Sequence, residues 1–359
     1  TPKAVLLEHG GTYNTAASHI EQCGVRPDDR LLQFAAFGFD GAIIESLMAL
    51  GAGAELVLVP KDELLLGESL ARLLLDSDIT MATLQPSIMA TLPDLPLPRL
   101  RTLISAGEAC TGALVARFAA QRELWNAYGP TEGSVAVTLG RCSVADGDGE
   151  LPSIGRALPN TRVYILDEQL QPVAIGEPGE LYLGGVAVAR GYLNRPELTA
   201  QRFLPDPYSP HPGDRIYRTG DLARFRPDGR VEFLGRLDHQ VKLRGFRIEL
   251  GEIEAALLRH PAVRHCVVLA RSDEPGDQRL VAYVVPHPEA AFAIAELREL
   301  LRTSLPAFMI PAAFVVQAAL PLTSHGKVDR AALPPPGRMR PALATAYAAP
   351  RSEVERTLA

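Results

Sequence analysis

The sequence predicts an α/β domain followed by a smaller α+β domain, and three observations support this fold class. Residues 1–139 alternate helical stretches with short apolar strands. Residues 153–235 show an all-strand pattern, and the chain after residue 238 mixes amphipathic helices with strands. Because helices that alternate with buried strands are typical of crossover units, we expect a mostly parallel sheet in the first part.

The first part contains segments of clear type. We expect strands at residues 54–60, 79–85 and 100–107, which read AELVLVP, ITMATLQ and LRTLISAG. A helix is expected over residues 41–50, because the glycine-rich stretch at 51–53 ends it.

Asp40 directly precedes that helix, in an apolar stretch that contains Phe37 and Phe39. An ionised carboxylate in apolar surroundings is unfavourable unless a cation or hydrogen-bond donors meet it. Two interpretations stay open at this point. Asp40 is either the N-cap of the helix, a position that favours Asp, or it binds a cation that a ligand supplies.

The second part is expected to contain strands at residues 162–167 and 179–185, followed by a hairpin with Pro-Asp-Gly at its turn, residues 227–229. Counting outward from this turn along both strands brings Asp221 and Arg236 close together. A carboxylate there can accept both hydroxyls of a ribose, with the arginine as a nearby donor. The alternative is a surface ion pair, which stabilises little.

The third part is expected to be a compact α+β unit. Its predicted helices are residues 249–260 and 294–305, and its predicted strands are 262–271, 279–286 and 312–317. From Pro334 the chain is rich in Pro and Ala, which is typical of a semi-rigid linker, and residues 351–359 begin a further helix.

Composition and charge argue against several classes of protein. The chain has 359 residues, a net charge of −6 and no basic stripe, which argues against a nucleic-acid surface. Its four cysteines form no Cys-x-x-Cys pair, so we expect reduced thiols in a cytoplasm. No apolar run is long enough to span a membrane, and no signal peptide is visible. Thr1 in place of Met indicates a fragment of a longer chain.

The stretch NAYGPTEGS, residues 126–134, offers several nucleotide-binding groups together. Tyr128 offers a ring face to a base, and Thr131 offers a hydroxyl to a phosphate. Glu132 offers a hard oxygen ligand to Mg²⁺, which prefers carboxylates and phosphate oxygens. The alternative is an ordinary turn with a packed tyrosine. Lys327, in a loop after an apolar strand, either meets developing negative charge or is simply solvated.

In this order and at these spacings, the motifs resemble the adenylation domains of nonribosomal peptide synthetases, within the adenylate-forming superfamily. The resemblance runs from Thr1 to about Leu333. The motifs that support it are TPKAV, FGFD, NAYGPTEGS, GELYLGGVAVARGYLNRPELTAQRF, YRTGDLARFRPDG, GRLDHQVKLRGFRIELGEIEAAL, LPAFMIPAAFVV and LPLTSHGKVDR.

The resemblance implies a domain organisation. Residues 1–237 would be the remaining part of the large N-terminal domain, with crossover β/α units and a small β-barrel-like subdomain. Residues 238–333 would be a small mobile C-terminal domain that turns about a hinge at Asp238. Residues 334–359 would be a linker and the start of a fused carrier domain.

The resemblance also implies a reaction and its residues. With ATP and Mg²⁺, an amino acid forms an aminoacyl-adenylate, and the acyl group then passes to the phosphopantetheine thiol of a carrier domain. The implied ATP-binding residues are Tyr128 at the adenine, Asp221 and Arg236 at the ribose, Gly107 and Ala127. The implied catalytic residues are Lys327 at the attacking carboxylate, Thr131 at the phosphate and Glu132 as the Mg²⁺ ligand.

For Asp40 the resemblance implies pairing with the α-ammonium of the substrate, which favours the ligand interpretation over capping. The residues implied beside it in the substrate pocket are Gly41, Ile44, Thr83, Ile104, Ala106, Ala127, Val135 and Ala136. None of these eight is charged, four are Gly or Ala, and three offer branched apolar walls. We therefore expect a large apolar amino acid, with Phe or Tyr first.

Two alternative functions stay open. An acyl- or aryl-CoA synthetase of the same superfamily shares the ATP motifs but has no amine for Asp40 to pair. The second is a non-catalytic adenylate-binding module, which is suggested because the phosphate loop that precedes TPK in the family is absent here. The same absence is expected if this chain is the C-terminal portion of a longer polypeptide. His325 and Phe308 stand where Asn and Tyr are common, which should not abolish the chemistry.

The expected partners are the amino acid, a carrier domain fused at the C-terminus, and condensation or other synthetase modules. The sequence leaves open whether a small helper protein takes part. No nucleic acid and no membrane are expected.

Overall fold

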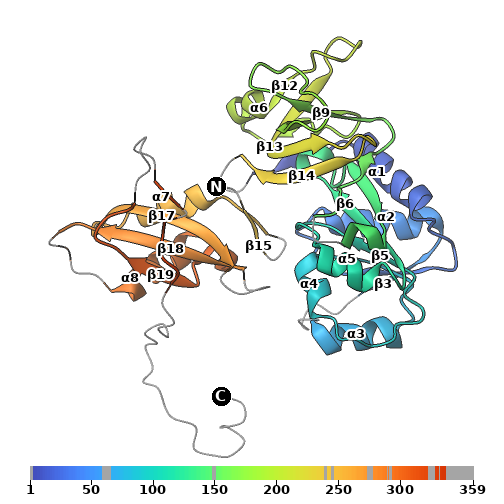
Figure 1. The fold of residues 1–359 in the computed structure, drawn as a ribbon, viewed down its shortest axis with the longest axis horizontal. Coiled ribbons are helices and arrows are strands. Elements are labelled where there is room, and N and C mark those ends of the chain that lie inside the picture. Colours follow the sequence, from blue (N-terminus) through green and yellow to red (C-terminus); the bar gives the residue numbers. More distant parts are fainter. Residues whose placement is uncertain are drawn as a thin grey trace, which may run out of the picture. The chain divides into compact units, whose positions relative to one another are not determined.

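The computed structural model divides into two compact units, Thr1–Asp238 and His239–Ala359, which we describe separately (Figure 1). The described residues are 3–58, 66–147, 151–237, 241–243, 246–272, 278–288, 290, 293–321, 328–330 and 332–336. The expected boundary between residues 237 and 238 lies one residue before this division. The roles of the two parts, and a carrier domain after residue 334, stay predictions.

A seven-stranded sheet is the centre of the larger unit, with strand order β3-β2-β4-β5-β6-β7-β8. The bounds are β2 (Arg30–Gln33), β3 (Glu55–Leu58), β4 (Met81–Leu84), β5 (Thr102–Ser105), β6 (Glu123–Tyr128), β7 (Thr138–Cys142) and β8 (Arg156–Ala157). The pairs from β3 to β6 are parallel, and β7 and β8 join antiparallel. The expected parallel sheet of crossover units is therefore confirmed.

Helices cover both faces of this sheet. Because successive residues of a strand point to opposite faces, neighbouring positions of one strand pack against different helices. Leu31, Met81 and Ile104 pack against α1 (His9–Gln22) and α2 (Gly41–Ala52). Their neighbours Leu32 and Leu103 instead share a core with α3 (Gly67–Asp76), α4 (Pro86–Thr91) and α5 (Gly112–Phe118). The helix predicted over residues 41–50 is confirmed as α2, which ends before Gly53 in the left-handed conformation, where glycine is unstrained.

An antiparallel sheet with strand order β12-β13-β10-β9 forms the second part of the larger unit, and β14 pairs with β13. Its strands are β9 (Thr161–Leu166), β10 (Gly179–Gly185), β12 (Phe203–Pro205), β13 (Arg215–Phe225) and β14 (Val231–Arg236). A separate short pair joins β1 (Val5–Leu6) to β11 (Gly191–Tyr192). Two 3₁₀ turns, η1 (Thr131–Gly133) and η2 (Val144–Gly147), lie in loops.

The all-strand prediction for residues 153–235 is wrong at one place, where α6 (Pro196–Arg202) forms a helix. Its sequence PELTAQR starts with proline, whose fixed φ suits the first turn of a helix. The Thr199 hydroxyl donates to the Arg195 carbonyl and accepts the Tyr192 backbone N–H, which ties the helix to β11.

Among its described residues, the smaller unit contains a three-stranded sheet and two helices. Its elements are β17 (Val263–Ser272), β18 (Gln278–Pro286), β19 (Ala313–Val316), α7 (Leu250–Leu257), α8 (Ile294–Ser304) and the 3₁₀ turn η3 (Ala307–Met309). β17 and β18 pair antiparallel and β19 joins parallel, and this sheet with its helices confirms the α+β prediction. The sequence did not predict the short hairpin of β15 (Val241–Leu243) and β16 (Phe246–Ile248) that precedes α7.

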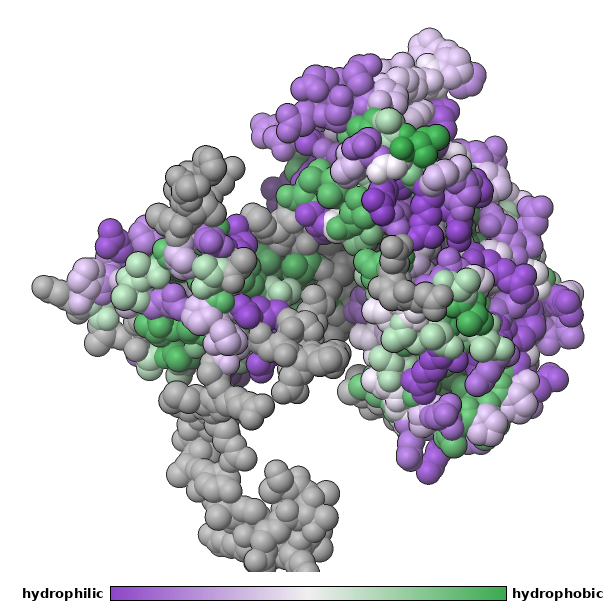
Figure 2. All heavy atoms as spheres, viewed as in Figure 1, coloured by the Kyte–Doolittle hydropathy of each residue, from purple (hydrophilic) through white to green (hydrophobic). Residues whose placement is uncertain are grey.

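The surface of the larger unit is mostly hydrophilic on the face that Figure 2 shows, with hydrophobic residues in separate groups. Within the described part of the chain, no helix is both long and apolar enough to cross a bilayer. The four cysteines are free thiols, and three of them are buried.

Candidate active site

The carboxyl ends of the parallel strands β2, β4, β5 and β6 meet at one edge of the seven-stranded sheet. Ligands of open α/β sheets bind outside this edge. Asp40 lies in the connection after β2, Gly107 after β5, and Tyr128 ends β6. Gly107 has φ +85°, a left-handed conformation that a residue with a side chain would strain.

Tyr128 is buried and its hydroxyl donates a hydrogen bond to the Asp221 carboxylate. The residue therefore joins the first sheet to the second, across 93 positions of sequence. Burial, together with the neighbouring Asp221 charge, raises the pKa of the Tyr128 hydroxyl well above its ordinary value. The phenol consequently stays protonated and remains a donor.

Asp221 and Arg236 are directly opposite each other in the β13–β14 pairing, which confirms the predicted closeness; a register shift between Leu222 and Ala223 makes Arg236 rather than Gly235 the partner of Asp221. The Arg236 Nη1 donates to Asp221 Oδ1 at 2.5 Å, and its Nη2 donates to the Thr219 carbonyl at 3.2 Å. The Asp221 and Arg236 side chains are only 7% and 12% exposed, so the surface ion pair considered for them is wrong. Asp221 thus receives hydrogen bonds from both the Tyr128 hydroxyl and the Arg236 guanidinium, which orient its carboxylate.

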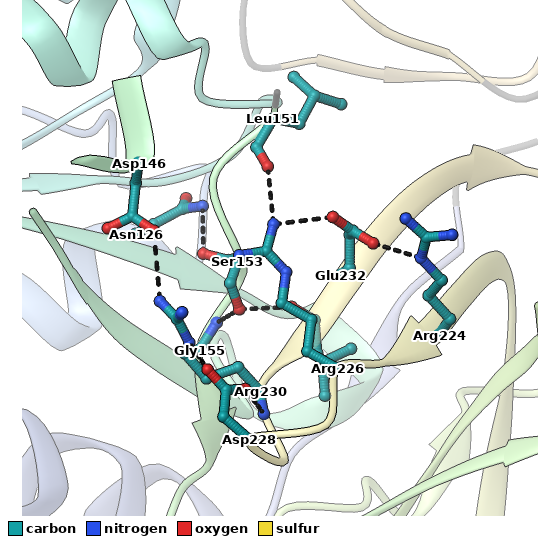
Figure 3. A network of polar contacts seen from close by, with 11 residues as sticks. Asn126, Asp146, Leu151, Ser153, Gly155, Arg224, Arg226, Asp228, Arg230 and Glu232 are labelled. Atoms are coloured by element: carbon teal, nitrogen blue, oxygen red, sulfur yellow. Dashed lines mark hydrogen bonds and ion pairs between the residues drawn. The ribbon is translucent and has the colours of Figure 1, made fainter. Parts of the chain in front are cut away.

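A polar network holds this hairpin against the seven-stranded sheet (Figure 3). The Asn126 side chain on β6 donates to the Ser153 carbonyl at 3.1 Å, and the Ser153 hydroxyl donates to the Val231 carbonyl on β14 at 2.6 Å. Arg230 reaches Asp146 across the same junction at 3.3 Å. Further charged side chains of the network come from the hairpin itself: Arg224, Arg226, Asp228 and Glu232. These contacts fix Asp221 relative to Tyr128.

Glu132 is 2% exposed and its Oε1 accepts a hydrogen bond from the Tyr192 hydroxyl at 2.6 Å. Burial and the Glu132 charge raise the pKa of Tyr192, which therefore stays a donor. Sequence reasoning missed Tyr192 as a site residue, although it lies in the motif GELYLGGVAVARGYLNRPELTAQRF. Contact between residues 60 positions apart leaves no local signal in the sequence.

Asp40 occupies the N-cap position of α2 but its side chain makes no capping hydrogen bond within the described structure. The capping interpretation is therefore not supported by the geometry. The half-buried carboxylate stands at the end of the loop 34–40.

The start of that loop is tied to α2 by Glu45, a buried carboxylate one turn further along the helix. Its Oε2 accepts the backbone N–H groups of Phe34 and Ala35, each at 3.1 Å, and the Gln33 amide at 3.2 Å. Burial is the main reason why the pKa of Glu45 is raised to about 7, and the three hydrogen bonds oppose that rise.

The residues expected around the substrate side chain lie together. Six of the eight belong to one apolar cluster beneath α1 and α2: Ile44, Ile104, Ala106, Ala127, Val135 and Ala136. Thr83 on β4 is the strand neighbour of Ile104 and is half-buried. Gly41 starts α2, where an added Cβ would lie 3.5 Å from the Ala35 Cβ. The structure thus brings together residues that lie far apart in the sequence.

Two predicted residues lie outside the described residues, namely Lys327 and Asp238. Thr131 starts η1 and is half-buried, one position before Glu132. In the described part of the chain, no group of three or more His, Cys, Asp and Glu side chains is arranged to hold a metal ion. Among these described residues, Glu132 therefore does not belong to a cluster of three or more potential metal ligands.

Comparison with known proteins agrees with this geometry. Residues 1–193 match the family described as AMP-binding enzyme, and residues 252–327 match the AMP-binding enzyme C-terminal domain. The first match spans more than half of the chain, so the chain belongs to the AMP-binding enzyme family. Its relatives include a phosphinothricin tripeptide synthetase of Streptomyces viridochromogenes, and its structural neighbours include NRPS proteins with adenylation domains, which confirms the resemblance in the motifs.

A linear gramicidin synthase of Brevibacillus parabrevis is 48% identical over 358 residues, which are 100% of this chain and 7% of that protein. The crystal structure of IdnL1 superposes with a TM-score of 0.80 at 32% identity, over 89% of this chain and 67% of that one. PA1221, an NRPS protein containing adenylation and PCP domains, superposes with a TM-score of 0.80 at 33% identity, over 92% of this chain and 57% of that one. The chain thus spans a small part of the long gramicidin synthase that it matches.

Proposed function

We propose that this chain activates an amino acid with ATP, forming an aminoacyl-adenylate and pyrophosphate, for transfer to a carrier domain in nonribosomal peptide synthesis. The observation that supports this most is the buried Tyr128–Asp221–Arg236 cluster at the carboxyl edge of the sheet. It combines an aromatic ring with an oriented carboxylate, and Ala127, the residue before Tyr128, belongs to the apolar cluster beneath α1 and α2. A nucleotide and an amino acid both find suitable groups there.

In the proposed reaction, Tyr128 contacts the adenine and Asp221 accepts the ribose hydroxyls. Arg236 holds the Asp221 carboxylate, so the nucleoside meets a group that is already oriented. Gly107 and Ala127 line the same nucleotide site. The main contribution of these residues is positioning, which makes attack on the α-phosphate an intramolecular step.

Asp40 receives the substrate ammonium, and its lack of a capping bond supports this role. The substrate carboxylate then attacks the α-phosphorus of ATP, the bond to the pyrophosphate oxygen breaks, and pyrophosphate leaves. Lys327 meets the negative charge that develops at the attacking and phosphoryl oxygens, where donors act most strongly in a transition state. Thr131 contacts the phosphate.

Mg²⁺ fits the chemistry of Glu132, because this ion takes only one or two protein carboxylates beside substrate phosphates. Bound there, it would neutralise phosphate charge. Tyr192 keeps the Glu132 side chain in one orientation through the bond at 2.6 Å.

The proposed substrate is a large apolar L-amino acid, with the aromatic Phe or Tyr first and Trp or Leu next. The small residues Ala106, Ala127 and Ala136 leave room, and Ile44 and Ile104 provide apolar walls. A charged side chain would be buried there without a partner, at a cost of several kcal/mol.

The second half of the reaction requires partners. We propose that a carrier domain fused after residue 334 receives the acyl group on its phosphopantetheine thiol, and that Asp238 is the hinge between the two half-reactions. PA1221, which contains adenylation and PCP domains, supports this arrangement by analogy. Condensation or other modules would act on the loaded carrier.

ATP–pyrophosphate exchange on the full-length protein, run across the twenty amino acids, tests the proposal. We expect exchange that depends on a large apolar amino acid, with residual activity for neighbours in size, since a methylene changes binding by only ~1–3 kcal/mol. Preference for Asp, Lys, Ser or Gly would refute the substrate assignment. Exchange with acids that lack an amine would favour a CoA synthetase, and no exchange would favour a binding module.

A further inference from the structure

The backbone of the β6–β7 connection is strained at Val135. Ser134 has φ 56° and Val135 has φ 77°, both in the left-handed region. The Ala136 N–H donates to the Ser134 carbonyl at 3.0 Å, so the three residues form a γ-turn with Val135 at its centre. This turn with positive φ is the rare, strained form, and a β-branched residue in it is an outlier.

The surrounding structure forces the turn into this shape. The Thr15 hydroxyl on α1 is fully buried and lies within hydrogen-bond distance of two carbonyls of the turn, Ser134 O at 3.0 Å and Ala136 O at 3.2 Å. The Ser134 hydroxyl donates to the Ala187 carbonyl at 2.7 Å. One threonine therefore holds the residues on both sides of Val135.

Two glycines allow this close packing. A Cβ on Gly129 would lie 2.5 Å from the Ala136 Cα, and a Cβ on Gly11 would lie 2.5 Å from the Ser134 oxygen Oγ. The turn is thus enclosed by backbone on one side and by α1 on the other. Strained residues that persist because their surroundings over-determine them cluster at ligand sites, where the strain is part of the mechanism.

We propose that Thr15 is a positioning residue for substrate specificity, because its hydroxyl holds the strained turn that presents Val135 to the substrate side chain. This inference rests on the proposed function, in which Val135 and Ala136 line the amino-acid pocket. Thr15 itself touches the turn and acts only through it. Without the hydroxyl, the turn should relax toward unstrained angles and the pocket wall should move.

The test compares Thr15→Val, which keeps the side-chain shape and loses the donor, with Thr15→Ser, which keeps the donor. Thr80→Val is the matched control, since Thr80 is also buried and its hydroxyl donates to Asp29 at 2.7 Å, before the amino end of β4. In pyrophosphate exchange by the full-length protein, the measured quantity is the ratio of kcat/KM between the preferred amino acid and one that differs by a methylene. KM for ATP is measured in parallel.

We expect Thr15→Val to lower this ratio roughly tenfold, the discrimination that one methylene provides in an apolar pocket. Thr15→Ser should retain the ratio, Thr80→Val should not change it, and KM for ATP should stay the same in all three. An unchanged ratio in Thr15→Val, or an equal loss in Thr80→Val, would overturn the inference. Absence of exchange in the unmodified protein would instead contradict the proposed function.

Val135→Gly provides a second route if Thr15→Val does not fold, because glycine adopts positive φ without strain and removes the side chain that the turn presents. We expect this variant to lose the same discrimination while KM for ATP stays the same. Retained discrimination in Val135→Gly would also overturn the inference.

Discussion

Glu45→Gln should abolish a specific pH dependence of stability in the larger unit. The pKa of Glu45 is about 7 in the folded chain against an ordinary value of 4.5. Between these values the folded state holds a proton that the unfolded state has lost, so the free energy of unfolding falls as pH rises through this window. One pKa unit corresponds to ~1.4 kcal/mol. The free energy of unfolding of the wild-type protein should therefore fall by ~3 kcal/mol between pH 4.5 and 7 because of Glu45, and this group should cause no further loss above pH 7.

The assay is urea unfolding at half-unit steps of pH, with the difference between wild type and Glu45→Gln as the readout. Subtracting the free energy of unfolding of the variant from that of the wild type cancels the contributions of the other titrating groups, because both proteins contain them. Glu68→Gln is the control for the substitution itself, because the Glu68 side chain is 76% exposed in an i,i+4 pair with Arg72. A flat difference between wild type and Glu45→Gln across pH 5 to 8 would show that the Glu45 carboxylate is ionised throughout.

Three further outcomes are expected. Lys327→Ala should lower the rate of adenylate formation by ~10²–10³ in single-turnover kinetics while ATP binding persists, and unchanged rates would remove Lys327 from the reaction. Asp40→Ala should raise KM for the amino acid with an unchanged melting temperature; a loss of ~1 kcal/mol of stability with an unchanged KM would restore the capping role. Tyr192→Phe removes the hydrogen bond to Glu132 and should raise the Mg²⁺ concentration needed for half-maximal exchange, whereas Tyr208→Phe, which loses a bond to a backbone carbonyl on the surface, should not.

Elements governed by local chemistry could be predicted from the sequence. The Pro-Asp-Gly turn at residues 227–229 sets the register of its hairpin near the turn, so counting predicts that Asp221 and Arg236 lie close, although a register shift between Leu222 and Ala223 decides their exact pairing. Apolar strands between helical stretches predicted the parallel sheet, and the glycine at position 53 marked the end of α2. Each of these features depends on residues close in sequence.

Features that depend on distant contacts could not be predicted. Tyr192 reaches Glu132 and Thr15 reaches Ser134 across 60 and 119 positions, and nothing in the local sequence of either marks the contact. The helix α6 was missed because seven residues within a strand-rich region give too short a pattern. The role of Asp40 was ambiguous for a different reason. Only the three-dimensional structure shows whether a carboxylate at an N-cap position makes the capping hydrogen bond.

The most direct test of amino-acid activation compares the preferred amino acid with its des-amino analogue, for example L-phenylalanine with 3-phenylpropanoate, as substrates for ATP-dependent adenylate formation detected by mass spectrometry. A site built around a carboxylate that awaits an ammonium should reject the analogue by on the order of 10⁴ in kcat/KM. Equal conversion of the two acids would contradict the account, because Asp40 would then have no part in recognising the substrate.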